Sequence, residues 1–137
     1  MRLADIPTVS FCKLAETPEI YVNKLVRIEA NYIVWWESSY LYGDSCSNDE
    51  HKIHNAIDCA SEDEKCTKTF AKEWDKLTPY MRDSGRRYKT LTAYRVKAVF
   101  TGRLIGPGGF GHLNSFRYAL RIRSVDKASS IPKNAPW

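Results

Sequence analysis

Three cysteines and two histidines in the middle of the chain are the residues whose types best fit metal chemistry. They are Cys46, His51, His54, Cys59 and Cys66. Zinc prefers thiolate and imidazole ligands, but no Cys-x-x-Cys pair presents two ligands together here. The residues around His51 form the charged run Asp49-Glu50-His51-Lys52, which is typical of a solvated loop. We therefore expect no metal and no other cofactor.

A disulfide explains the same cysteines more simply. Cys59, near the end of an expected strand, and Cys66, in the first turn of an expected helix, are the predicted pair. Cys46 competes for either partner, and four cysteines including Cys12 permit three complete pairings. At least one bridge is expected among Cys46, Cys59 and Cys66. This favours an extracytoplasmic, for example periplasmic, protein whose signal was removed, while reduced thiols in a cytoplasmic protein remain the alternative.

No motif for nucleophilic catalysis or phosphate binding is complete. His112 lies near Ser115, but nothing marks an orienting acid or an oxyanion site. The glycine-rich segment 106–111 is not followed by Gly-Lys-Ser/Thr or by an expected helix, so it predicts a hairpin loop with positive φ angles. We therefore do not expect an enzyme.

The composition is that of one ordinary globular domain. The chain has 137 residues, of which 43% are hydrophobic and 27% charged, and no apolar run is long enough for a transmembrane segment. Residues 1–127 are expected to form a single, monomeric domain, and residues 128–137 a polar C-terminal tail.

Charge is distributed unevenly along the chain. Residues 1–78 hold 9 Lys/Arg against 14 Asp/Glu, a net charge of −5, whereas residues 79–137 hold 12 against 2, a net charge of +10. The two halves either neutralise each other within one domain or build an anion-binding face from the second half.

Hydropathy patterns predict the elements that position these residues. A short helix is expected over Thr8 to Glu16, before Thr17-Pro18. Strict alternation predicts a long strand from Leu25 to Trp35, and two short strands are expected at Ser39 to Tyr42 and Asn55 to Ala60.

A longer helix is predicted after the third strand. Ser61-Glu62-Asp63-Glu64 fits a capping box, and apolar residues then recur at spacings of four, four and three until Pro79 ends the helix. These apolar residues are Cys66, Phe70, Trp74 and Leu77, and we expect Phe70 and Trp74 to pack in the core.

Alternation returns in the second half of the chain. One strand is expected around Tyr94 to Thr101 and a last strand around Arg117 to Arg123, and together they are predicted to form a hairpin.

The order helix, three strands, helix, two strands predicts a mainly β protein with helices, built as a five-stranded OB-fold Greek-key barrel. Its N-terminal helix precedes the first strand, and the longer helix lies between the third and fourth strands. Another small α+β roll with one antiparallel sheet is the alternative architecture.

Two stretches resemble small, mostly uncharacterised bacterial OB-fold-like proteins that are often exported. The first runs from Leu14 to Tyr21 and continues into Lys24-Leu25-Val26-Arg27-Ile28, and the second is Gly111-His112-Leu113 followed by Phe116-Arg117-Tyr118. The resemblance implies the fold and an extracytoplasmic setting, and it brings no catalytic residues.

An OB-fold binds its ligand across the second and third strands and the two loops that flank them. Aromatic residues fall there in this sequence, and basic residues on the last two strands could attract phosphates. The expected ligand-binding residues are Trp35, Trp36, Tyr40, Tyr42, Phe110, His112, Arg117 and Arg121, with Arg95, Lys97 and Arg123 as further cations.

Acidic residues near these aromatic residues bear on whether the ligand is a nucleic acid or a protein, peptide or envelope component. Glu37, Asp44, Asp49 and Glu50 lie beside the aromatic residues in the sequence and would repel a nucleic-acid backbone. The sequence therefore predicts a non-enzymatic binding module for a protein, peptide or envelope ligand, with single-stranded nucleic acid as the alternative.

Overall fold

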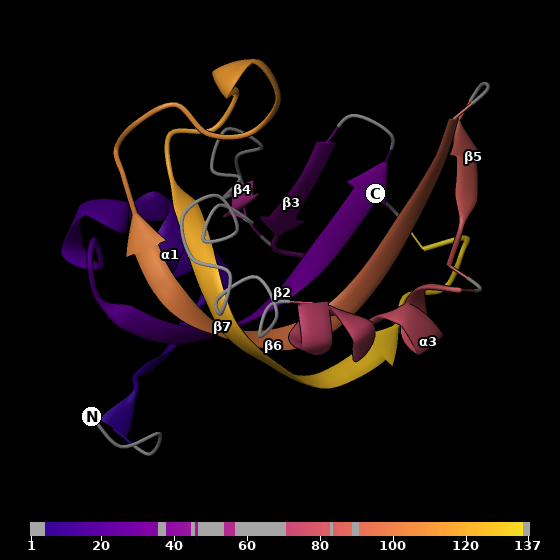
Figure 1. The fold of residues 1–137 in the computed structure, drawn as a ribbon, viewed down its shortest axis with the longest axis horizontal. Helices are drawn as coiled ribbons and strands as arrows, with labels where there is room; N and C mark the ends of the chain where they lie inside the picture. The colour runs from indigo at the N-terminus through magenta and orange to yellow at the C-terminus, as the bar shows by residue number, and fades with distance from the viewer. Residues whose placement is uncertain are drawn as a thin grey trace.

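The protein is mainly β, with a few short helices around one strongly curved sheet (Figure 1). The computed structural model describes residues 5–35, 38–44, 46, 54–56, 71–82, 84–88 and 91–135. No helix within these ranges has the length and apolar character needed to cross a membrane. The strands are β1 (Thr8–Ser10), β2 (Leu25–Trp35), β3 (Ser38–Tyr42), β4 (His54–Ala56), β5 (Arg86–Tyr88), β6 (Leu91–Ile105) and β7 (Ala119–Ser130).

The expected N-terminal helix is shorter than predicted. α1 (Phe11–Glu16) begins after Ser10, whose side chain accepts a hydrogen bond from the Lys13 amide at 3.1 Å. Ser10 itself has an extended backbone, as N-cap residues do, so the helix begins only at the next residue. Thr8–Ser10 therefore pair as β1, parallel to β2. α1 ends where predicted, before the 3₁₀ helix η2 (Pro18–Ile20).

The alternating pattern correctly predicted β2 over its full length. Its inner-face side chains, Val26, Ile28, Ala30 and Tyr32, are all 2% exposed or less. The second expected strand is present as β3, one residue longer at its start. β4 overlaps the third expected strand, of which residues 57–60 lie outside the described part of the chain.

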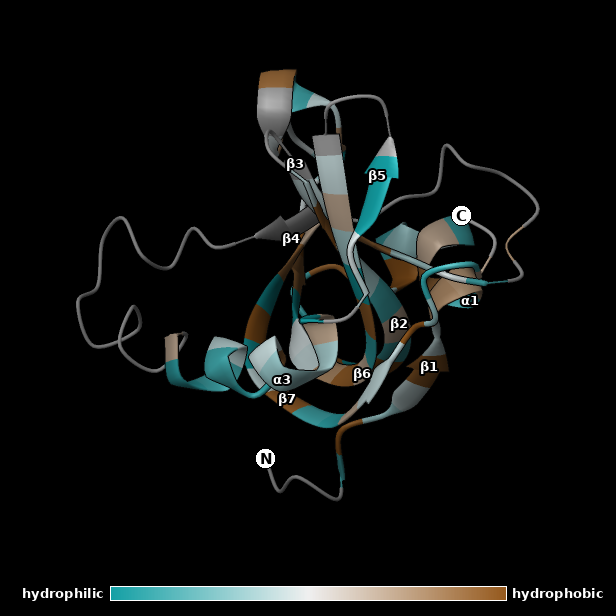
Figure 2. Cartoon of the chain, turned by 90° about the vertical axis from the view of Figure 1, so that its right-hand side faces the viewer, coloured by the Kyte–Doolittle hydropathy of each residue, from teal (hydrophilic) through white to brown (hydrophobic). Residues whose placement is uncertain are grey.

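β2 lies at the centre of an open, mixed sheet. β6 pairs with one edge of β2, and the other edge is shared by β1 and β3. β7 then pairs antiparallel with β6, and β4 pairs parallel with β7. Figure 2 shows this sheet curling around its apolar interior. β5 pairs with the start of β6.

The closed barrel that the sequence predicts is not formed by the described strands. Closure requires a ladder between β3 and β4, and these strands approach within 8 Å between Cα atoms without pairing in the described structure. Within the described residues, the segment that leaves β3 at Gly43 is tied back to α1.

A disulfide between Cys12 of α1 and Cys46 makes this tie, with Cα atoms 5.2 Å apart. A disulfide is present, as expected, and it includes Cys46, one of the three candidate cysteines, but its partner is Cys12, which was not among them. Sequence proximity had favoured Cys59 and Cys66, and both lie outside the described residues. Folding brings Cys12 and Cys46 together across 34 positions of sequence.

β6 and β7 form the predicted antiparallel hairpin. Their connection, residues 106–118, includes the expected positive φ angles at Gly106 and Gly111 and the 3₁₀ helix η4 (His112–Asn114). β7 continues to Ser130, past the start of the expected polar tail, because its last residues still pair with β6.

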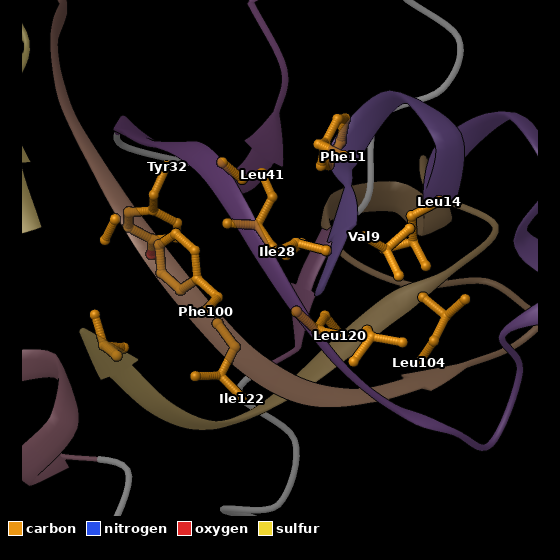
Figure 3. Packing of buried hydrophobic residues seen from close by; sticks show 14 of the residues in the cluster. Val9, Phe11, Leu14, Ile28, Tyr32, Leu41, Phe100, Leu104, Leu120 and Ile122 are labelled. Atoms are coloured by element: carbon orange, nitrogen blue, oxygen red, sulfur yellow. The ribbon is translucent and has the colours of Figure 1, made fainter. Parts of the chain in front are cut away.

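The core lies against the inner face of the sheet (Figure 3). Phe11 and Leu14 of α1 contribute to it, and Leu77 belongs to the same buried cluster. Residues 71–75 are helical, and Trp74 packs edge-on against Tyr32 at 4.6 Å between ring centroids, which confirms its predicted packing role. Residues 61–70, including Phe70, lie outside the described residues.

Pro79 does not end a helix as predicted. It stands in the first turn of α3 (Thr78–Met81), where a missing amide hydrogen costs nothing.

Candidate functional site

Three aromatic residues gather on the outer face of β2 and β3. Trp35 follows Asn31 and Ile33 on that face of β2, and the register places Tyr40 opposite Ile33 and Tyr42 opposite Asn31. Trp35 is 37% exposed, and both tyrosines are half-buried. We call Trp35, Tyr40 and Tyr42 the aromatic face.

The loop between β6 and β7 contributes a fourth ring. Phe116 stacks at a tilt on Tyr40, with ring centroids 5.4 Å apart. Phe116 and Phe110 are held together by two backbone hydrogen bonds of 2.9 and 3.1 Å across the loop. Arg117, the next residue, is exposed. The fold therefore brings β3 into contact with a loop more than 70 positions later in the chain.

Arg95 lies on the same outer face and is only 1% exposed. Its guanidinium donates hydrogen bonds to the carbonyls of Pro132 and Ala135, at 3.2 and 3.0 Å. Residues 132–135 form a turn, closed by the Ala135 amide on the Pro132 carbonyl. We call these residues the C-terminal turn. Because the turn folds over Arg95, a cation that the sequence pattern places on a solvent face is buried.

Arg95 also connects the C-terminal turn to the aromatic face. It donates a hydrogen bond to the Tyr42 hydroxyl. Burial raises the pKa of Tyr42 above its ordinary value, and the nearby Arg95 charge opposes this only in part. Tyr42 is therefore a neutral phenol throughout the physiological pH range.

A polar cluster of Asn31, Asp44 and Lys97 borders the aromatic face. Asp44 accepts from the Asn31 amide nitrogen at 2.5 Å and from Lys97 at 2.6 Å. The hydrogen bond from Lys97 is the main reason why the pKa of Asp44 is lowered, and the same contact raises the pKa of Lys97. Asp44 is thus neutralised locally, although the sequence indicated a repulsive acid beside the aromatic residues.

The structure separates some residues that the sequence grouped together. Arg121 stands opposite Arg103, which pairs with Leu25 at the far end of β2 from Trp35. Arg121 is therefore remote from the aromatic face, whereas Arg117 adjoins it. Trp36 and the side chain of His112 lie outside the described residues.

Sequence reasoning missed the burial of Asn31 and Arg95. Both occupy polar positions in an alternating pattern, and their burial depends on segments that fold over them from elsewhere in the chain. In the residues described, no group of three His, Cys, Asp or Glu side chains is placed to hold a metal ion. Cys46, a residue of the zinc set considered above, is committed to the disulfide.

Comparison with protein-family models, with curated proteins and with solved structures found no match to this chain.

Proposed function

We propose that the chain is a non-enzymatic binding module of OB type that binds an extended segment of a protein or peptide on its aromatic face. The strand connectivity supports the OB assignment. β2, β3, β4, β6 and β7 follow the chain order of the five OB strands, with β2 paired to β3 and β6, β7 paired to β6, and β4 parallel to β7.

The C-terminal turn is the observation that most favours a peptide as the ligand. Arg95 holds two carbonyls of that turn beside Tyr42, so this face already packs against peptide backbone. Trp35 and Tyr40 of the same face, and Phe116 which stacks on Tyr40, leave part of their ring surface open. Aromatic rings of this kind supply contact area at low entropic cost.

Single-stranded nucleic acid is the second candidate, because Arg117, the residue that follows Phe116, is exposed. A ring and a neighbouring cation are the elements that bind a base and its phosphate. We place this candidate second because Arg103 and Arg121, the opposed cations of β6 and β7, lie at the other end of the sheet.

The Cys12–Cys46 disulfide supports an extracytoplasmic setting, since such bonds persist mainly in oxidising compartments. In that setting a protein, peptide or envelope ligand is available and nucleic acid is scarce. We propose that the module acts there as a monomer.

Selection of displayed random peptides tests the peptide proposal. Peptides enriched on the wild-type protein are expected to lose binding to Tyr40→Ser, because that variant removes the ring between β3 and the β6–β7 loop. Tyr80→Ser on α3 is the matched control, since Tyr80 is 40% exposed outside the aromatic face. Enriched peptides that bind both variants equally would reject the aromatic face as the site.

An oligothymidine titration at low salt, followed by tryptophan fluorescence, tests the second candidate. Nucleic-acid binding should weaken steeply with added salt, and Arg117→Ala should weaken it more than Arg121→Ala. No response at low salt would remove nucleic acid from consideration.

A further inference from the structure

A gap in the sheet edge lies beside the aromatic face. β1 and β3 share one edge of β2: β1 ends opposite Glu29, and β3 ends opposite Asn31. Ala30, between them, pairs with neither strand. A cavity of about 370 Å³ opens at this point, within the size range of small-molecule sites. It is lined by Ser10, Phe11, Glu29, Asn31, Asp44 and Lys97, among others.

The disulfide holds one wall of this cavity in place. A Cβ added at Gly43 would lie 2.8 Å from the Phe11 ring and 2.9 Å from the Cys46 sulfur, so only glycine allows the chain to pass so closely. The Cys12–Cys46 bond therefore fixes the segment that carries Asp44 against the start of α1. The site is built by covalent and steric constraint rather than by one mobile loop.

Hydrogen bonding within the cluster leaves one acceptor, the Asn31 side-chain oxygen, without a donor among the described residues. Asp44 accepts only, so it orients the Asn31 amide with its nitrogen toward the carboxylate. The Asn31 oxygen is then left buried and without a donor among the described residues, in a side chain that is 1% exposed and lines the cavity. A buried acceptor of this kind favours a ligand that brings its own donor.

The charge of the cavity selects the type of donor. Lys97 is matched by Asp44 at 2.6 Å. Glu29 lines the same cavity, and no salt bridge to it is found in the described part of the chain. The described lining therefore has a net charge of −1, from Glu29 and Asp44 against Lys97. Val9 and Phe11 add apolar surface beside these groups.

We infer that this cavity binds a primary alkylammonium group, as carried by a lysine side chain or by a free amine. The ammonium donates to the Asn31 oxygen and to Glu29, and its alkyl stem lies against the apolar wall. This site is distinct from the aromatic face, and its test does not depend on the peptide proposal.

Titration of the full-length, oxidised protein with n-butylammonium, followed by amide NMR, tests the inference. Saturable shifts are expected at the Asn31 side-chain amide and at the Gly43 and Asp44 backbone amides, with a Kd of about 1–10 mM for so small a ligand. Butanol and butyrate, of the same length, should not saturate these signals. Saturation by butyrate or Mg²⁺ in place of the amine, or no saturation by the amine at about 50 mM, would overturn the inference.

Two charge variants should change the affinity in opposite directions. Glu29→Gln is expected to weaken butylammonium binding about three- to fivefold, since it removes one partly screened ion pair. Lys97→Met should strengthen it by a similar factor, because Asp44 then faces the ligand without its own cation. Glu19→Gln, an exposed acid on η2, is the control. The reverse order of affinities would indicate an anion site at Lys97.

A lysine amide blocked by N-acetylation distinguishes the two sources of the ammonium group. Tighter binding of the blocked lysine than of butylammonium assigns the site to a protein or peptide partner. Tighter binding of butylammonium assigns it to a free amine.

Discussion

The two faces of β2 and β6 are buried for different reasons. On the inner face, Tyr32 and Phe100 are buried among apolar side chains, as the alternating pattern requires. On the outer face, Asn31 and Arg95 are buried to the same degree, although both are polar. The segment after β3 carries the Asp44 partner of Asn31, and the C-terminal turn folds over Arg95. Burial on the inner face follows from hydropathy, and on the outer face it follows from what the rest of the chain places there.

The largest effect should come from the inner face. Phe100→Ala removes a fully buried ring from the core and is expected to lower the free energy of unfolding by about 3–5 kcal/mol. Urea unfolding of oxidised protein measures it. A loss below about 1 kcal/mol would mean that this face is not the tightly packed one.

The disulfide should contribute the next largest effect. Replacing Cys12 and Cys46 together by Ala is expected to cost about 2–4 kcal/mol, because the bond closes a long loop in the unfolded chain. The difference between the free energies of unfolding of the oxidised wild type and the double variant measures this cost. Equal stability of the two would show that the segment after β3 is held by other contacts.

Arg95 and the C-terminal turn should act as one unit. Arg95→Met removes the hydrogen bonds from the guanidinium to the Pro132 and Ala135 carbonyls and is expected to cost about 1–3 kcal/mol. A chain ending at Ser130 loses the same contacts, so the double variant should cost less than the sum of the two single changes. Strict additivity in this double-mutant cycle would show that the turn does not cover Arg95 in solution.

The smallest effect concerns acid stability of the outer face. The pKa of Asp44 is lowered in the folded protein, chiefly by the hydrogen bond from Lys97. Its stabilisation is therefore present above the ordinary carboxyl pKa of 3.8 and is lost as the pH falls through the lower folded value. Because the carboxylate is largely exposed, the loss should be below about 1 kcal/mol.

Asp44→Asn isolates this contribution. The variant should be less stable than the wild type at pH 7 and equally stable at pH 2, as measured by urea unfolding at both pH values. An unchanged stability gap across this range would contradict the assigned contact between Asp44 and Lys97.

Local patterns in the sequence determined much of the inner half of this fold. Alternation over eleven residues gave the bounds of β2, because a strand with one face in the core must repeat with period two. Thr17-Pro18 correctly predicted the end of α1, whereas its start after the Ser10 cap was expected two to three residues too early, at Thr8. The hairpin of β6 and β7 and the core position of Trp74 followed from the same kind of signal.

Only the tertiary structure decided the outer face. Cys12 was within a predicted helix and Cys46 in a predicted loop, and nothing in their spacing indicated that folding would join them. Asn31 and Arg95 each continue a polar alternation, which by itself predicts solvent exposure. Their burial, the cavity beside Ala30 and the contact between Tyr40 and Phe116 all depend on segments far apart in the chain, and local sequence patterns do not encode which distant segment will cover a given face.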